Sequence, residues 1–222
     1  MNTPYAGPRQ LDFDTLLSRS FENLWLIRKE IAIYLVIVTV AAFTLPLVGQ
    51  SLAGGAGIAS YLIGQYWLFQ SLLKARGMLE TTRNHILAFV GLAALLIFPI
   101  MFGIAAFVLP GLFLVARWIA APAFVAARGR GVFAAAGDSW ETVRGNTGKL
   151  AGAVVVMFLI VSFLGTITGL IDGTLTGLGA DSRAKPLDLI ELQLLPLLLL
   201  GLSVATYELL GPKDTMIEDV FG

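Results

Sequence analysis

One arginine of this sequence stands inside an apolar stretch, where a charge is costly to hold. Arg117 is the sole charged residue of LPGLFLVARWIAAPAF, residues 109–124. Insertion scales assign an arginine at the middle of a spanning helix about 2.5–3.5 kcal/mol, so Arg117 needs a partner. A planar guanidinium pairs in a bidentate way with a carboxylate or a phosphate. The candidates are Glu191 of the same chain and the phosphate of a lipid headgroup.

Little else in the sequence offers catalytic or metal chemistry. The chain has no cysteine and one histidine, His85, which excludes thiolate chemistry and histidine-rich metal sites. The apolar segments carry scattered Ser, Thr and Gln without a base beside them. We therefore expect a protein that is not an enzyme and uses no metal and no cofactor. Fifteen basic residues balance fifteen acidic ones, so we expect no nucleic-acid partner.

The composition places most of the chain in lipid. Of the 222 residues, 57% are hydrophobic and only 14% are charged, and the mean hydropathy is +0.82. Soluble domains are normally about 45–50% apolar. Backbone amides find no partner in hydrocarbon, and long apolar runs without alternation favour helices over a barrel. The sequence predicts an all-α, polytopic membrane helical bundle.

Six stretches approach the roughly 20 residues that a membrane-spanning helix needs. They are residues 31–48, 52–73, 86–109, 111–127, 150–171 and 189–210. Pro110 and Gly111 predict a tight turn between the third and fourth, and Pro122 predicts a kink late in the fourth. The fourth is the shortest, and without it the count becomes five.

Basic residues fall almost entirely on one side of these spans. Cytoplasmic loops are enriched in Lys and Arg, so this side is predicted to be cytoplasmic and to hold both termini. It contains Arg9, Arg19, Arg28, Lys29, Lys74, Arg76, Arg83, Arg128, Arg130, Arg144, Lys149 and Lys213. We expect a cytoplasmic N-terminal segment at 1–30, a membrane domain at 31–211 and a cytoplasmic tail at 212–222.

Two segments have the pattern of amphipathic helices that lie in the membrane interface. One is in the N-terminal segment and the other spans 131–145. Their apolar faces are predicted to consist of Phe13, Leu17, Phe21 and Leu24 in the first and of Phe133, Ala136, Trp140 and Val143 in the second. The sequence SFENL at 20–24 also matches SWETV at 139–143. Either an internal duplication or the shared needs of interfacial helices accounts for this match.

Small residues recur every fourth position in two of the predicted spans. Such residues let helix backbones approach closely in lipid. They are Gly165 and Gly169 in the fifth span and Ala56, Ser60 and Gly64 in the second. We interpret them as helix-packing stripes, with a groove for a ligand or lipid tail as the alternative.

The stretch from Leu109 to Leu150 resembles the signature of the bacterial glycerophosphoryl diester phosphodiesterase membrane-domain family. The resemblance is carried by Leu109, Pro110, Gly111, Arg117, Pro122, Ser139, Trp140, Arg144, Gly145 and Asn146. It implies a six-span protein of the bacterial inner membrane. Some members of the family also carry a soluble phosphodiesterase barrel, for which the six spans and surface helices leave no room. The family name therefore implies no phosphodiesterase activity for this chain.

These features suggest two functions. The first is binding of membrane lipids, in particular an anionic phospholipid, by Arg117 with Glu191 as its protein counterpart. Arg128, Arg144 and Trp140 near the second interfacial segment would add to the attraction for acidic headgroups. The second is a structural or assembly module that docks a partner membrane protein or a second copy through its glycine stripe. An accessory role in a phosphodiesterase system is a weaker alternative.

Overall fold

Regular structure is entirely helical in the described part of the chain. The computed structural model describes residues 10–81, 83–177 and 186–211, so the predicted tail at 212–222 and residues 1–9 lie outside the described residues. Its elements are α1 Phe13–Leu26, α2 Arg28–Val48, α3 Gln50–Ala75, α4 Ile86–Ala106, α5 Val108–Trp118, α6 Ala121–Arg128, α7 Val132–Thr142, α8 Thr147–Gly177 and α9 Pro186–Leu210. The prediction of an all-α helical bundle is confirmed.

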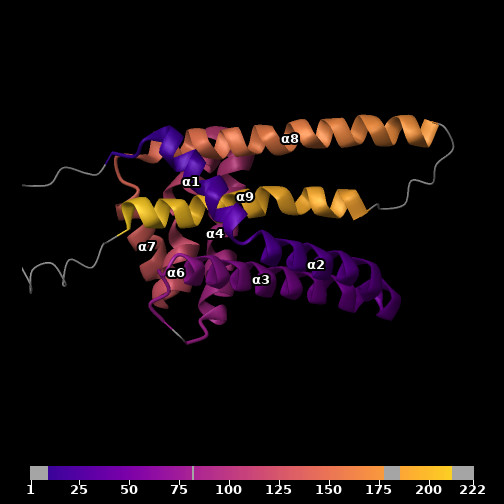
Figure 1. Ribbon diagram of the computed structural model, residues 1–222, viewed down its shortest axis with the longest axis horizontal. Coiled ribbons are helices and arrows are strands. Elements are labelled where there is room, and N and C mark those ends of the chain that lie inside the picture. The colour runs from indigo at the N-terminus through magenta and orange to yellow at the C-terminus, as the bar shows by residue number, and fades with distance from the viewer. Residues whose placement is uncertain (1–9, 82, 178–185, 212–222) are drawn as a thin grey trace, which may run out of the picture.

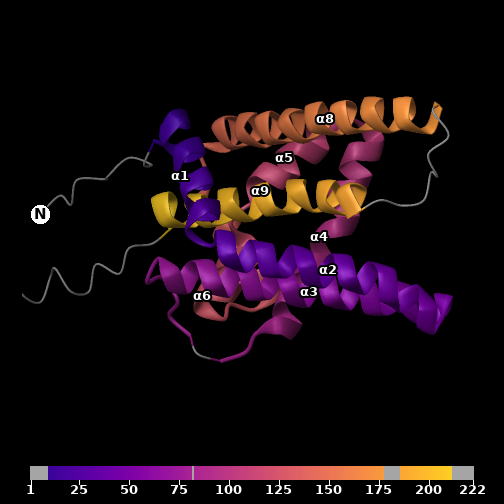
Figure 2. The same cartoon turned by 45° about the vertical axis from the view of Figure 1, so that its right-hand side comes forward.

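Five segments of the described chain are long and apolar enough to cross a membrane, one fewer than predicted. They are Arg28–Leu47, Ile86–Ala106, Val108–Arg128, Thr147–Ile171 and Ile190–Leu210. The remaining predicted span, 52–73, falls within α3, which is 26 residues long but is not apolar enough to count as a span. Two glutamines and four glycines lower the hydropathy of residues 52–73. It nevertheless runs back along α2 as the second arm of a hairpin (Figures 1 and 2).

The long helices are arranged so that one end of the molecule gathers the short ones. In Figure 1, α8, α9 and the α2–α3 hairpin run roughly parallel to the long axis, and α1, α6 and α7 lie toward the same end. We call this the basic end, because the segments there carry most of the described Lys and Arg residues. The chain passes into α2 from α1 and into α8 from α7 at this end. Each surface helix is thus followed by a long apolar helix, as the sequence pattern predicted.

The predicted turn at Pro110 and Gly111 is wrong by a few residues. The break between α4 and α5 falls at Phe107, whose backbone is extended (φ −160°, ψ 141°), and Pro110 lies in the first turn of α5. Proline is tolerated there because the first turn leaves its amides unbonded in any case. Gly111 serves packing instead: a Cβ on it would lie 2.7 Å from the backbone nitrogen of Ile104. The pair α4 and α5 therefore crosses at very short range.

Pro122 also marks a helix boundary. The helix α5 ends at Trp118, and α6 begins at Ala121 with the proline in its first turn. The predicted kink in the fourth span thus falls beside a two-residue interruption, Ile119 and Ala120, whose backbone dihedrals stay in the right-handed helical region. Gly129 then ends α6 in the left-handed conformation (φ 63°), which glycine adopts without steric cost.

The surface helices bury small and polar side chains beside their predicted apolar faces. In α1 the side chains against the protein are Leu16, Ser20 and Asn23, while Phe21 is 44% exposed. The other large apolar side chains of the predicted face, Phe13, Leu17 and Leu24, are half-buried and pack against the core. The N-terminus of α1 is capped by Asp12, which accepts a hydrogen bond from the amide of Thr15 at 3.0 Å. The hydrogen bonds from Thr15 hold the pKa of Asp12 below its usual range.

The predicted apolar face of the second segment is also divided, since Val143 is fully buried and Ala136 of α7 is half-buried against the core. Ala135 and the serine at 139 are buried, and Phe133 is 79% exposed. In both helices the serine of the matched five-residue segment is fully buried against the protein. Small side chains face inward because they let a helix lie close across its neighbours.

Candidate functional site

Arg117 lies in the last turn of α5, near the basic end and facing α7. Its Nη1 donates a hydrogen bond to the backbone carbonyl of Trp140 at 3.0 Å. The guanidinium carbon also lies 4.7 Å from the centroid of the Trp140 ring and 5.3 Å from that of Phe113. A cation near aromatic ring faces is attracted by their quadrupoles. We call Arg117, Phe113 and Trp140 the arginine box.

A reciprocal pair of hydrogen bonds joins α5 and α7 at this point. The last four carbonyls of any α-helix lack an intrahelical partner, and these include the carbonyls of Arg117 in α5 and Trp140 in α7. The hydroxyl of Ser139 donates to the Arg117 carbonyl at 2.9 Å, while the Arg117 guanidinium donates to the Trp140 carbonyl. Each helix therefore caps the other, and the positive guanidinium also meets the negative end of the α7 dipole.

The charge of Arg117 is not neutralised by any carboxylate among the described residues. None of the ion pairs in that part of the chain includes this arginine. Its Nε atom is buried and has no hydrogen-bond partner. Most buried polar atoms in proteins are hydrogen-bonded, so an exception calls for an explanation such as a bound water or ion. The arginine box has donor capacity that the described chain leaves unused.

The predicted pair between Arg117 and Glu191 does not form. Glu191 instead accepts a hydrogen bond from the Thr168 hydroxyl at 2.6 Å, linking α9 to α8. Its side chain lies over Gly165, where an added Cβ would be 3.2 Å from the Glu191 carboxyl carbon. The Glu191 carboxylate lies between α8 and α9, whereas the Arg117 guanidinium faces α7.

Of the other predicted lipid-binding residues, one lies in the arginine box and two lie elsewhere. Trp140 belongs to the arginine box. Arg128 pairs with Glu80 at 2.7 Å, and Arg144 is an exposed side chain 3.6 Å from Glu141. Neither contributes to the arginine box.

The remaining residues of the predicted motif shape the link from α7 to α8. Gly145 adopts a positive φ of 84°, which L side chains rarely adopt. The Asn146 side chain accepts a hydrogen bond from the Leu11 amide at 2.8 Å. This bond ties the segment before α1 to the start of α8, so Gly145 and Asn146 have structural roles.

The small residues predicted to form helix-packing stripes in α3 and α8 differ in how closely they contact a neighbouring helix. Gly64 packs on the ring of Tyr34, where an added Cβ would lie 2.6 Å from Cδ2 of that ring, and Ser60 borders a groove shared with α2. Ala56 is half-buried in the same helix. Gly169 meets no atom within 4 Å.

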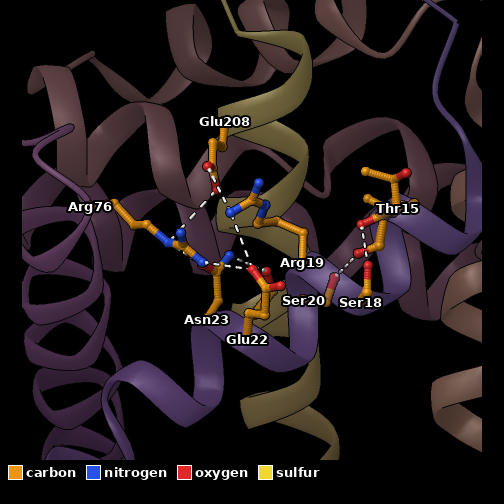
Figure 3. A network of polar contacts seen from close by, with 10 residues as sticks. Thr15, Ser18, Arg19, Ser20, Glu22, Asn23, Arg76 and Glu208 are labelled. Carbon is orange, nitrogen blue, oxygen red and sulfur yellow. Dashed lines mark hydrogen bonds and ion pairs between the residues drawn. The ribbon is translucent and has the colours of Figure 1, made fainter.

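A second cluster of polar side chains fastens α1 to α3 and α9, and the sequence alone did not indicate it (Figure 3). Arg76 lies 3.6 Å from Glu22 and 3.9 Å from Glu208, and Arg19 approaches the same two carboxylates at 3.2 and 3.8 Å. Arg76 also donates to the buried Asn23 side chain at 2.7 Å. We call these five residues the α1 network. Its two arginines and two glutamates neutralise one another.

No group of three or more His, Asp or Glu side chains within the described residues could hold a metal ion. The comparisons with known proteins give no further guide. No protein-family model, curated protein or solved structure matches the chain. The candidate site is therefore argued from its own geometry.

Proposed function

We propose that this protein is an integral membrane protein that binds an anionic phospholipid, with the Arg117 guanidinium as the group that receives the lipid phosphate. The observation that carries the proposal is a partly buried arginine with no carboxylate partner in the described chain and an unused Nε donor. A guanidinium offers two parallel N–H groups to phosphate oxygens. One nitrogen bonded to Trp140 leaves others for a ligand.

The surroundings of the arginine box support the proposal. The box belongs to α5 and α7 at the basic end, and the apolar ring of Phe133 on α7 is exposed as expected for contact with lipid. Basic residues near a membrane surface each contribute about 1 kcal/mol to the attraction for acidic headgroups, and the exposed Arg144 follows α7 directly. Headgroup attraction and a fixed phosphate partner would thus act on the same lipid leaflet.

We further propose that the chain belongs to the bacterial inner membrane with both termini in the cytoplasm, so that the basic end faces the cytoplasm. The resemblance to the glycerophosphoryl diester phosphodiesterase membrane-domain family supports this placement. The reciprocal capping gives the motif a physical rationale, because Arg117, Ser139 and Trp140 meet in space. The proposed role is a non-enzymatic one.

Native mass spectrometry of protein purified from mixed phosphatidylglycerol and phosphatidylcholine would test lipid binding. We expect wild-type protein to retain phosphatidylglycerol preferentially. Hydrogen bonds to charged groups contribute about 1.5–3 kcal/mol, so Arg117→Ala should lower this retention about tenfold or more. Arg117→Lys keeps the charge but loses the fork, and should recover retention only in part.

Ser139→Ala is the matched control for this experiment. It removes the other half of the reciprocal capping but leaves the guanidinium in place. If Ser139→Ala loses phosphatidylglycerol as fully as Arg117→Ala, the effect is due to helix packing and the proposal is wrong. The proposal would also be abandoned if wild-type protein showed no preference for the anionic lipid.

A second candidate function, docking of a partner membrane protein or a second copy, is favoured by one observation. Gly169 on α8 leaves open space in the apolar part of the helix, whereas Gly165 is already occupied by Glu191. A docking role predicts that Gly169→Leu disperses a complex recovered by crosslinking in cells. An unchanged crosslinking pattern in this variant would remove the docking role.

A further inference from the structure

A cavity of about 310 Å³ lies among α3, α4, α5 and α9, and its described lining residues do not include Arg117, Phe113 or Trp140. Ligand pockets for small molecules are roughly 300–1,000 Å³ and mostly apolar, so this cavity is large enough for a slender ligand. Its walls are largely aromatic and aliphatic, with contributions from Phe69, Phe89, Leu96, Trp118 and Leu200. Two prolines also line the cavity, namely Pro122 in the first turn of α6 and Pro196 inside α9.

One buried hydroxyl on the wall has no partner. Ser203 is 2% exposed, lines the cavity, and makes no hydrogen bond through its Oγ. Serine and threonine in helices commonly donate to the carbonyl four residues earlier. Ser20 and Thr206 do this, each at 2.7 Å. Ser203 makes no such bond, so a residue of the cavity wall carries a buried Oγ without a hydrogen-bond partner.

The cavity lining also excludes a charged ligand. No Lys, Arg, Asp or Glu is among its described lining residues, whose polar side chains are Tyr61, Gln65, Trp118 and Ser203. The Gln65 amide is already committed in part, because it donates to the Tyr34 hydroxyl at 3.2 Å. Burying an unpaired ion in such surroundings is strongly unfavourable. The lining therefore suits an apolar molecule with one hydrogen-bonding group.

We infer that this cavity binds an uncharged lipid, a hydrocarbon chain or ring bearing a hydroxyl or carbonyl oxygen that hydrogen-bonds to Ser203. This site is distinct from the arginine box. At about 100° per residue, Val115 projects from the side of α5 opposite to Phe113 and Arg117, and the two sites approach each other where the Trp118 ring lies 5.9 Å from the Trp140 ring. The inference therefore does not depend on phosphate binding at Arg117.

Photolabelling in phosphatidylcholine nanodiscs tests the inference, with a ten-carbon alcohol that carries a diazirine as the probe. The alkane of equal length with the same diazirine is the second probe. We expect the alcohol to label peptides that contain the cavity walls, such as those around Gln65 and Ser203. Ser203→Ala should lower labelling by the alcohol about threefold to tenfold, as expected for one hydrogen bond, and should leave labelling by the alkane unchanged.

Two neighbouring alanines of α4 give a matched pair of variants. Ala93 lines the cavity, whereas Ala94 is exposed on the outside of the helix. Ala93→Phe should fill the space and lower labelling by both probes at least fivefold, and Ala94→Phe should leave it within twofold of wild type. Equal labelling in the two variants, or labelling spread over exposed helix faces, would overturn the inference. If Ala93→Phe fails to fold, equal alcohol labelling of wild type and Ser203→Ala would overturn it as well.

Discussion

The two surface helices, α1 and α7, are fastened to the bundle by different physics. The α1 network joins α1 to α3 and α9 through two arginines and two glutamates, and the Glu22 side chain is 59% exposed. The helix α7 is joined to α5 by reciprocal capping between Arg117 and Ser139, with no carboxylate present. The first arrangement neutralises its own charges. The second holds α7 in place and leaves a cation with unused donors.

This difference shows why an arginine near a membrane cannot be interpreted from its position alone. Arg76 makes ion pairs and a hydrogen bond to the side chain of Asn23, so its charge is neutralised within the protein. Arg117 makes contacts of similar number but with a neutral carbonyl and two aromatic rings. Of these two arginines, Arg117 is therefore the one that retains a net charge for a ligand.

The largest expected effect comes from removing the cation that caps α7. Arg117→Ala deletes a charge-assisted hydrogen bond and two ring contacts, for an expected loss of about 2–4 kcal/mol. Hydrogen exchange of peptides from α7 should then become at least tenfold faster, while peptides from α1 stay protected. Equal loss of protection in both helices would show that they are not fastened independently.

The close crossing of α1 and α9 should give the next effect. A Cβ on Gly201 would lie 2.7 Å from the backbone carbonyl oxygen of Ser20, so Gly201→Ala must push α1 away. Overpacking of this kind costs about 1–3 kcal/mol. The control is Gly137→Ala in α7, where the new methyl meets open space. Thermal unfolding in detergent should show a lower midpoint for Gly201→Ala and an equal or higher midpoint for the control.

The sequence predicts the membrane helices well and the contacts between them poorly. Apolar content and length predicted the helices and the membrane, because lipid imposes both on any spanning segment. The arginine in the apolar stretch was also recognisable. Its partner was not, since the contact with Trp140 depends on where α5 breaks and how α7 folds back. The predicted partner, Glu191, is an acidic residue of another apolar stretch, but position in the sequence does not determine the direction in which a side chain points.

The α1 network and the cavity at Ser203 were not foreseen for a related reason. The network joins residues as distant along the chain as Arg19 and Glu208, and nothing in their local sequence relates them. The unpartnered state of Ser203 is a property of packing among four helices. The inward face of α1 could have been anticipated from Ser20 and Asn23, whose small or polar side chains recur beside the apolar face.

The smallest expected effect is a difference in salt response. Raising ionic strength from about 0.1 to 1 M shortens the Debye length from about 10 to 3 Å, which weakens exposed ion pairs such as that between Arg76 and Glu22. Exchange in α1 should therefore quicken by about twofold to threefold. Exchange in the last turn of α7 should change less, because Arg117 holds it through a neutral carbonyl and aromatic rings, whereas the exposed pair that Arg130 forms with Asp138 earlier in α7 should respond to salt as α1 does. A stronger salt response in the last turn of α7 would contradict the proposed difference between the two helices.

The most direct test of an available charge at Arg117 is an experimental structure in nanodiscs that contain brominated phosphatidylglycerol. We predict a phosphate oxygen about 2.7–2.9 Å from a nitrogen of the Arg117 guanidinium, as in charge-assisted hydrogen bonds, with the Phe113 and Trp140 rings beside it. A carboxylate of the protein in that position, or a guanidinium with every donor satisfied by the chain, would contradict the account.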